Sequence, residues 1–388
     1  MDLSEASLKL HKKVQGKIAI TSKVSVKTKR DLSLAYTPGV AAVCRAIARS
    51  PEKAYDYTIK ANTVAIVTDG SAVLGLGNIG AEAALPVMEG KALLFKEFAG
   101  LNAFPLCFNT HNPLEIITGV KNIAPAFGGI NLEDIKAPEC FEIEAALQDL
   151  GIPVFHDDQH GTAIVILAGL INAAKVVGKR LENMKIVING AGAAGIAVAK
   201  LLSCVGYDKR ICTSVRDVIV LDSKGAIYKG RSGLNKYKHE IAQIVNKSDY
   251  RGSLPGALKG ADVFIGVSTG GVLKPEMIKH MAEKPIIFAM ANPIPEIMPK
   301  EAKRAGAAII GTGRSDFPNQ INNVLAFPGV FLGALQARSK TITNEMKLAA
   351  AYALATCVTP TTERILPDPL DKNVASRVAA AVKRAAKE

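Results

Sequence analysis

Residues 185–197, "KIVINGAGAAGIA", decide the fold of this chain of 388 residues. A strand-like apolar run leads directly into a loop with glycines at Gly190, Gly192 and Gly195, and a segment without proline follows. This spacing gives a tight turn, a close approach of the backbone to a pyrophosphate, and a helix N-terminus facing its charge. The segment therefore predicts a Rossmann-like loop that binds a dinucleotide.

The strand expected after this loop, "VIVLD", ends in Asp222, a carboxylate suited to the ribose hydroxyls of an adenosine. Asp222 follows Gly195 by 27 residues, which is more than the usual ~20. The loop at 204–217, "CVGYDKRICTSVRD", accounts for the extra length. The acid completes the pattern of a nucleotide site.

A second stretch at 73–80, "VLGLGNIG", has the same glycine spacing. The segment "DGSAVL" separates its first glycine from the preceding strand-like run, Pro86 interrupts the helix that should follow, and the next strand closes on Asn109 rather than on an acid. A nucleotide loop needs the strand, the helix and the acid together. We therefore expect one nucleotide site, at Gly190, and a structural turn or substrate loop at 73–80.

Strand-like and helix-like runs alternate along most of the chain. Strand-like runs occupy 63–68, 103–109, 152–156, 185–190, 218–222, 262–267, 285–291 and 307–312, and helix-like runs occupy 86–100, 139–151, 161–179 and 193–206. Such alternation predicts an α/β fold with largely parallel sheets. We expect an N-terminal α/β domain over 1–160 and a Rossmann-like, doubly wound nucleotide-binding domain over 161–388 that ends in a helical tail.

Composition and cysteine usage narrow the class of protein. Hydrophobic residues make up 48% and charged residues 21%, which is ordinary for a globular protein. Six cysteines without a C-x-x-C pair predict reduced thiols and a cytoplasmic location. The sequence has no signal-peptide pattern and no segment that approaches an uninterrupted membrane span, so we expect no membrane partner.

The formal net charge of +13 raises the question of nucleic-acid binding. That function needs Lys and Arg gathered on one face, and stacking platforms for bases. Here the basic residues are diluted along the chain, and no aromatic-rich strand accompanies them. The charge therefore favours a basic surface that attracts a small anionic substrate, and we expect no nucleic-acid partner.

Two pairs of acids stand at the ends of apolar runs: Glu133 with Asp134, and Asp157 with Asp158. Charged pairs in such positions are costly unless something binds them. Carboxylate clusters without cysteine indicate a hard cation, Mg²⁺ or Mn²⁺. The alternatives are a zinc site that uses His156 and His160, or acids that only cap a helix and face solvent.

The segment "FHDDQHGTAIVILAGL" resembles the signature segment of the malic enzymes. The resemblance extends over nearly the whole chain, through "YTPGVA", "VTDGSAVLGLGNIG", "VMEGKALLFK", "NLEDI", "GAGAAG", "ANPIPEI" and "INNVLAFPGVFLG" in the family's order. It implies oxidative decarboxylation of (S)-malate to pyruvate and CO₂ with reduction of NAD⁺ or NADP⁺. It also implies a homodimer of the short prokaryotic form, whose active sites can borrow residues from the partner.

The resemblance assigns roles to individual residues. Lys91 is the implied base for the C2 hydroxyl of malate, and it must lose its proton to act, which requires burial or cationic neighbours that lower its pKa. Asp157 is the carboxylate that assists Lys91, and Tyr36 is the acid that protonates C3 of the enolpyruvate. The implied metal ligands are Glu133, Asp134 and Asp158.

Further residues match positions around substrate and cofactor. The implied cofactor positions are Thr162, Gly190, Gly192, Ala193, Ala194, Gly195, Asp222 and Asn292, and Asn292 also counts with Lys91 and Asn323 as a substrate position. Larger family members carry an arginine where this chain has Ser71-Ala72, so we expect Ser71 to help bind the malate carboxylate.

Two choices stay open from the sequence. Asp222 favours NAD⁺ because it would repel a 2′-phosphate, whereas Lys224 would offset that charge and admit NADP⁺, so we expect use of both. The alternatives for the reaction are another metal-dependent β-decarboxylating hydroxyacid dehydrogenase, acting on tartrate or an alkylmalate, or a non-catalytic nucleotide-sensing protein.

Overall fold

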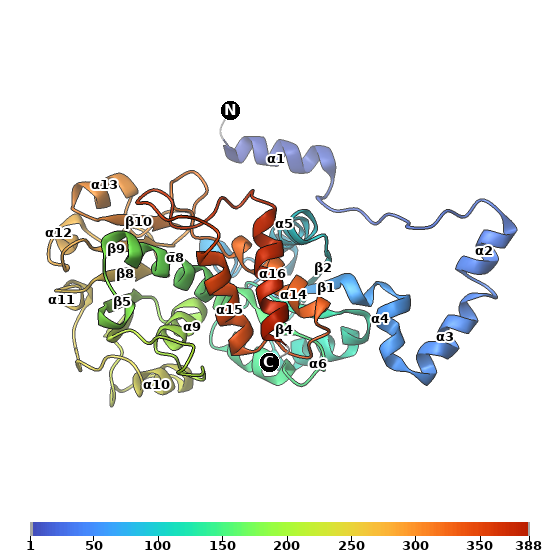
Figure 1. Cartoon of the computed structure of the whole chain (residues 1–388), viewed down its shortest axis with the longest axis horizontal. Helices are drawn as coiled ribbons and strands as arrows, with labels where there is room; N and C mark the ends of the chain where they lie inside the picture. The colour runs from blue at the N-terminus through green and yellow to red at the C-terminus, as the bar shows by residue number, and fades with distance from the viewer. Residues whose placement is uncertain (1–2, 387–388) are drawn as a thin grey trace.

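The computed structural model describes residues 3–386, which form two α/β domains and an arm that projects from one of them (Figure 1). The first domain is built on a four-stranded sheet of order β2-β1-β3-β4, in which all neighbouring strands are parallel. The strands are β1 (Thr63–Thr68), β2 (Asn102–Cys107), β3 (Gly129–Leu132) and β4 (Val154–His156). The helices that follow them are α5 (Ala81–Ala99), α6 (Pro113–Ile123) and α7 (Glu139–Leu147).

The second domain has a six-stranded sheet of order β10-β9-β8-β5-β6-β7. Its strands are β5 (Lys185–Asn189), β6 (Asp217–Asp222), β7 (Gly225–Ala226), β8 (Val263–Gly266), β9 (Ile286–Ala289) and β10 (Ile309–Thr312). All pairs are parallel except β6 with β7. The strand order reverses at β5, and ligands of doubly wound sheets bind at such a switch point. The predicted fold class is confirmed.

Helices surround this second sheet and connect it to the first domain. They are α8 (Thr162–Val177), α9 (Ala193–Leu202), α10 (Lys236–Ala242), α11 (Leu254–Ala257), α12 (Pro275–Ile278) and α13 (Pro299–Arg304). Short helical turns occur in both domains and in the segment before β1. They are η1 (Pro51–Lys53), η2 (Ile59–Asn62), η3 (Leu74–Leu76), η4 (Ala124–Ala126), η5 (Asp157–Gly161), η6 (Leu181–Asn183) and η7 (Asn323–Leu325).

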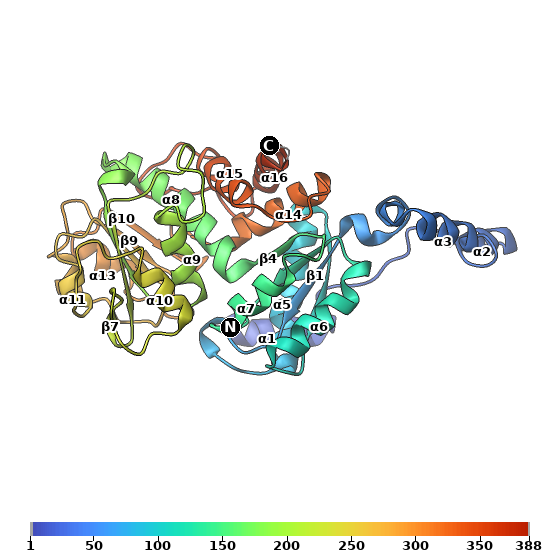
Figure 2. The ribbon, with the colours of Figure 1, turned by 90° about the horizontal axis from the view of Figure 1, so that it is seen from below.

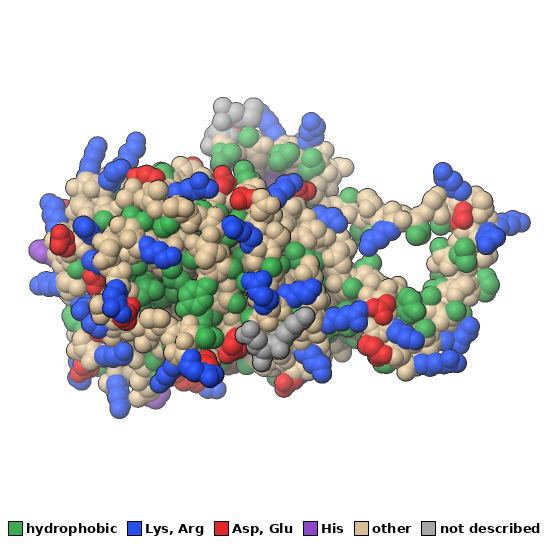
Figure 3. Space-filling view, viewed as in Figure 1, with side chains coloured by type: hydrophobic (Ala, Val, Ile, Leu, Met, Phe, Trp, Pro, Cys, Tyr) green, Lys and Arg blue, Asp and Glu red, His purple; other side chains and the backbone are tan. Residues whose placement is uncertain are grey.

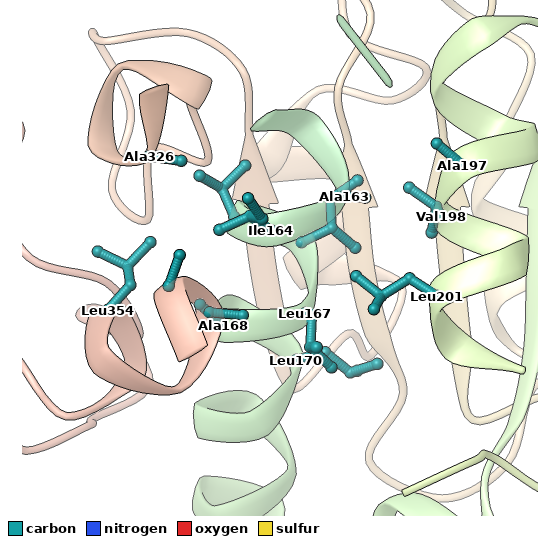
Figure 4. Close-up of a cluster of buried hydrophobic side chains, with 14 of the residues drawn as sticks. Ala163, Ile164, Leu167, Ala168, Leu170, Ala197, Val198, Leu201, Ala326 and Leu354 are labelled. Atoms are coloured by element: carbon teal, nitrogen blue, oxygen red, sulfur yellow. The ribbon is translucent and has the colours of Figure 1, made fainter. Parts of the chain in front are cut away.

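The apolar helix α8 is the central support of the molecule. Leu167, Leu170 and their neighbours pack between α9 on one side and α15 (Asn344–Ala355) on the other (Figure 4). The helical segment Asp157–Val177 is long and apolar enough to cross a membrane by length and composition, and 72% of its most apolar window is buried inside the protein. We expected no segment that approaches a membrane span. That expectation was wrong for Asp157–Val177, which packs as a core helix.

The end of the chain returns to the first domain. Helices α14 (Phe327–Gln336) and α16 (Asn373–Ala385) pack against each other and against α5. The Phe331 ring makes edge contacts with Phe95 of α5 and Phe155 of β4. A boundary at residue 160 stays a prediction, but the C-terminal helices contribute to the core of the domain that precedes it.

The N-terminal residues form the arm (Figures 1 and 2). Helix α1 (Leu3–Val14) is followed by an extended segment and by α2 (Lys29–Ala35), α3 (Val40–Arg49) and α4 (Ala54–Tyr57). Helices α2 and α3 lie away from the body in both views. The arm exposes apolar side chains, among them Leu32, Leu34 and Tyr36.

Three local features differ from the sequence-based expectations. Strand β3 was missed because Gly129 and Asn131 weaken its pattern, and its place between β1 and β4 makes it a strand. Pro86 does not interrupt a helix, since α5 begins at Ala81 and contains it. Cys204 and Cys212 form a disulfide, so the expectation of thiols that are all reduced was wrong, whereas the cytoplasmic location stays a prediction.

The basic surface follows the expected pattern on the face seen in Figure 3. Lys and Arg side chains are scattered over both domains and the arm on this face, and acidic side chains lie among them. Such a mixed face differs from the clustered basic surface of nucleic-acid-binding proteins.

Candidate active site

Lys91 and the predicted acids meet at the carboxyl ends of β3 and β4. Lys91 extends from the middle of α5, Glu133 follows β3, and Asp157 follows β4. The Lys91 Nζ lies 2.7 Å from Asp157 Oδ2 and 3.0 Å from Glu133 Oε1. Lys91 is 8% exposed and Asp157 is fully buried. The parallel sheet thus assembles residues that are far apart in the sequence.

The charges in this cluster change one another's protonation. Burial alone would lower the pKa of the Lys91 ammonium, but Asp157 and Glu133 outweigh it and raise that pKa above its ordinary value. Burial raises the pKa values of Glu133, Asp157 and Asp158, although Lys91 opposes this. The expectation that the surroundings lower the pKa of Lys91 was therefore wrong for the protein alone, because Asp157 and Glu133 lie 2.7 and 3.0 Å from its ammonium.

Glu133, Asp134 and Asp158 each offer a carboxylate oxygen, and the three oxygens lie within 4.8 Å of one another. Asp158 Oδ2 accepts a hydrogen bond from the Asp134 backbone N–H at 2.8 Å. These oxygen donors suit a hard divalent cation. The Lys91 ammonium contacts Glu133 of this group at 3.0 Å, and a divalent cation would offset further negative charge of the carboxylates. The residues therefore fit the expected Mg²⁺ or Mn²⁺.

The segment that joins β4 to α8 is a π-helical turn, η5, which carries Asp157 and Asp158. Such turns are frequently found at functional sites. Gly161 leaves room for the Asp157 carboxylate, since a Cβ at Gly161 would lie 1.8 Å from Asp157 Oδ1. His160 bonds to Glu144 instead of turning toward Asp158. A zinc site that uses His156 and His160 therefore finds no support in this geometry.

The stretch at 73–80 and the preceding Ser71 are held by contacts within the protein. The Ser71 hydroxyl donates to Asp69 Oδ1 at 2.6 Å and accepts from the Lys136 N–H at 2.9 Å. Ser71 thus has its hydrogen-bonding capacity engaged within the protein, which favours a role in shaping the loop. Its contact with malate stays a prediction. A Cβ at Gly75 would meet the Asn292 carbonyl oxygen at 2.0 Å, so this loop lies directly against the second domain.

The nucleotide loop has the geometry expected from its spacing. Gly190 adopts a φ of +126° and its N–H donates to the Leu221 carbonyl. A Cβ at Gly195 would lie 1.8 Å from the Gly190 carbonyl oxygen, whereas a Cβ at Gly192 would meet nothing within 4 Å. Gly192 is the residue before α9, which begins at Ala193 and continues through Ala194. The helix N-terminus is therefore open for a pyrophosphate.

Asp222 ends β6 as predicted, but it is paired with cations. Its Oδ1 accepts from the Arg231 guanidinium at 2.7 Å, and its Oδ2 accepts from the Lys238 ammonium at 2.8 Å. Burial alone would raise the pKa of Asp222, but hydrogen bonds from Lys238, Arg231 and the Lys224 N–H lower it. The negative charge that would repel a 2′-phosphate is therefore compensated.

Of the remaining predicted residues, Thr162 and Asn323 lie at the η5 turn and Asn292 faces the glycine loop, whereas Tyr36 lies on the arm. Thr162 begins α8 directly after η5, and Asn323 lies beside the same turn, with its Cβ 3.3 Å from the position of a Cβ at Gly161. Asn292 is exposed where the second domain faces the glycine loop. Tyr36 follows α2 on the arm and is 65% exposed. Figures 1 and 2 show that α2 lies far from α5 of the same chain, so this chain does not bring Tyr36 to Lys91.

Three residues of the site were missed. The Asn131 amide donates to Glu133 Oε2 at 2.8 Å, and the two-residue spacing along a strand could have indicated this. The Phe327 ring centroid lies 4.3 Å from Lys91 Nζ, but no local pattern signals a contact at such separation. Glu144 bonds to η5, and its position between Cys140 and Leu147 on the buried stripe of α7 could have marked it.

The fold and the two neighbouring sites define a two-domain oxidoreductase that uses a dinucleotide. The family profile described as malic enzyme, N-terminal domain, matches residues 15–148, and the profile described as malic enzyme, NAD binding domain, matches residues 159–387. A bifunctional malic/malolactic enzyme of Bacillus subtilis is 57% identical, with 100% of this chain and 94% of the relative covered. The NAD-dependent malic enzyme of Geobacillus stearothermophilus is 56% identical, with 100% and 79% covered.

A solved structure agrees with these relatives. The NAD-dependent malic enzyme of Thermotoga maritima has a TM-score of 0.93 and 51% identity, and 99% of each chain is covered. The chain therefore belongs to the malic enzyme family, and it is an enzyme of the NAD- or NADP-dependent kind.

Replacing Gly195 by alanine should affect stability, whereas replacing Gly192 by alanine should affect nucleotide binding. Gly195→Ala forces a Cβ against the Gly190 carbonyl oxygen, and we expect a loss of about 1–3 kcal/mol in unfolding free energy. Gly192→Ala has open space around it and should keep the thermal melting of the free protein. It should weaken NAD⁺ or NADP⁺ binding about tenfold or more, because the methyl group occupies the approach of the pyrophosphate. Thermal denaturation and calorimetric titration measure both effects, and equal destabilisation by the two variants would contradict this geometry.

Proposed function

We propose that this enzyme catalyses the oxidative decarboxylation of (S)-malate to pyruvate and CO₂ with reduction of NAD⁺ or NADP⁺, and that it depends on Mg²⁺ or Mn²⁺. The observation that carries the proposal is the buried group of Lys91, Glu133 and Asp157 together with the partly buried Asp158. It lies beside a loop that contacts the domain with the dinucleotide fold. A hydroxyacid between the two domains would meet both a base and a hydride acceptor.

Glu133, Asp134 and Asp158 would hold the cation, which would chelate malate and stabilise the enolate that remains when CO₂ leaves. Lys91 would take the proton of the C2 hydroxyl, and a bound nicotinamide would supply the acceptor for the C2 hydride. Because its ammonium is favoured in the protein alone, Lys91 must first give up a proton. Asp157 would accept that proton, since its Oδ2 lies 2.7 Å from the Lys91 Nζ.

Tyr36 would donate the proton that C3 of the enolpyruvate receives. The support for a homodimer is the exposed arm, where Leu34 is 67% and Tyr36 65% exposed. Apolar side chains projecting from a body without a core of their own need a covering surface. A second copy of this chain would cover the arm and receive Tyr36 at its own Lys91, in the manner of a domain-swapped dimer.

Both nucleotides should serve as cofactor, because Arg231 and Lys238 compensate the charge of Asp222. The ribose hydroxyls of NAD⁺ can still approach a carboxylate, and the 2′-phosphate of NADP⁺ finds cations next to it. A small anionic substrate also agrees with the dispersed basic surface.

Turnover of malate with Mn²⁺ and each nucleotide tests the main proposal. We expect pyruvate formation with both cofactors, and its absence with both would contradict the proposal.

Lys91→Ala should lower malate oxidation by about 10²–10⁴-fold, whereas Tyr36→Phe should impair mainly the protonation of enolpyruvate. Full activity of both variants would contradict the assigned roles. Comparing kcat/KM for malate, tartrate and an alkylmalate decides between the substrates.

Hybrid dimers test whether Tyr36 acts across the interface. A dimer of one Lys91→Ala chain and one Tyr36→Phe chain, co-expressed with two tags and purified through both, has one intact site if the residues come from different chains. We expect it to recover about half of the wild-type rate, because each of two symmetric sites takes residues from both chains. If both residues acted within one chain, the hybrid would be as inactive as the two parent dimers.

Cofactor choice should respond to Lys238. Removing its ammonium in Lys238→Ala leaves part of the Asp222 charge uncompensated, so kcat/KM for NADP⁺ should fall about tenfold more than that for NAD⁺. Lys236→Ala, an exposed lysine at the start of the same helix, is the matched control and should change neither value. An equal loss for both nucleotides in Lys238→Ala would show that the 2′-phosphate does not bind here.

A further inference from the structure

Glu144 of α7 bonds to the π-helical turn η5 and to the strand end before it. Its side chain is 12% exposed. Glu144 Oε1 accepts hydrogen bonds from the His156 N–H at 3.3 Å and from His160 Nε2 at 2.7 Å. Its Oε2 accepts from the Gln159 side-chain amide at 3.0 Å. One carboxylate therefore receives three donors from a stretch of five residues.

The three donors bracket the two acids of the turn. His156 directly precedes Asp157, and Gln159 and His160 directly follow Asp158. Helix α7 begins five residues after the other acid pair, Glu133 and Asp134. Glu144 therefore ties the strand end that carries one acid pair to the turn that carries the other.

We propose that Glu144 is a positioning residue, which holds the η5 turn so that Asp158 faces Glu133 and Asp134, and which thereby sets the affinity of the site for a divalent cation. This inference rests on the proposed metal site. The partners behind metal-binding side chains orient the ligands, and their loss typically costs about 10–100-fold in metal affinity or activity.

A cavity beside Glu144 gives the η5 turn space to change its conformation if this carboxylate is lost. A cavity of about 410 Å³ adjoins it and is lined among others by Gln159, His160 and Lys347. The Lys347 Nζ lies 3.4 Å from His160 Nε2 and brings a positive charge to the same group. Without Glu144, three donors lose their acceptor at the edge of a cavity, and water or an alternative side-chain position would replace it.

The test is Mn²⁺ binding to the free dimeric enzyme, measured by electron paramagnetic resonance of unbound Mn²⁺ and by calorimetry. Glu144→Ala should raise the Mn²⁺ Kd about 10–100-fold. Glu144→Gln keeps an oxygen that can accept from the His156 N–H and His160, so its Kd should lie between those of the wild type and Glu144→Ala. Glu142→Ala removes an exposed acid from the same helix and should leave the Kd unchanged.

Kinetics separate positioning from a general structural role. In Glu144→Ala the Mn²⁺ concentration for half-maximal rate should rise, and saturating Mn²⁺ should restore most of kcat. A lower melting temperature with an unchanged Mn²⁺ Kd in Glu144→Gln and Glu144→Ala would overturn the inference. Failure of the wild-type enzyme to bind Mn²⁺ would instead contradict the proposed metal site itself. If Glu144→Ala does not fold, the Kd of Glu144→Gln relative to Glu142→Ala decides.

Discussion

The contact of the Lys91 ammonium with Asp157 and Glu133 is the constraint on which the site depends. These groups come from α5 and from the ends of β3 and β4, so the contact requires the sheet, its parallel register and the helix in front of it. Burying acids near one another is unfavourable. Lys91 offsets part of that cost, and the remaining negative charge makes the same place attractive to a divalent cation.

The two glycine motifs have the same residue spacing, but their glycines are required by different steric contacts. At Gly195 a Cβ would collide with the Gly190 carbonyl oxygen of the same loop, and at Gly190 a Cβ would collide with Val267, the residue after β8. At Gly75 the backbone meets the Asn292 carbonyl of the other domain. The first set of glycines shapes a turn that faces a ligand, whereas Gly75 lets two domains come together over the space between them.

Much of this organisation could be predicted from the sequence, because it depends on residues that lie close together in the chain. Apolar strand runs, the loop at Gly190 and the acids at strand ends are all short-range signals. What failed depended on neighbours distant in the sequence: strand β3 is made by β1 and β4, and the pKa of Lys91 is raised by acids that follow β3 and β4. The pairing of Asp222 with Arg231 and Lys238 adds to the prediction that Asp222 ends its strand. Pro86 misled because proline is disfavoured in helix interiors, yet α5 accommodates it near its start.

The return of α14 and α16 to the first domain reverses the order in which the two halves can fold during synthesis. Phe95 and Phe155 bury their rings against α14, which follows Phe95 by more than half the length of the chain. The sheet of the second domain is complete once residue 312 has emerged, whereas the part of the first domain's core that contains Phe95 and Phe155 waits for α14 and α16. On the ribosome, where domains generally fold as they emerge, the nucleotide-binding half can therefore close before the half that was made first.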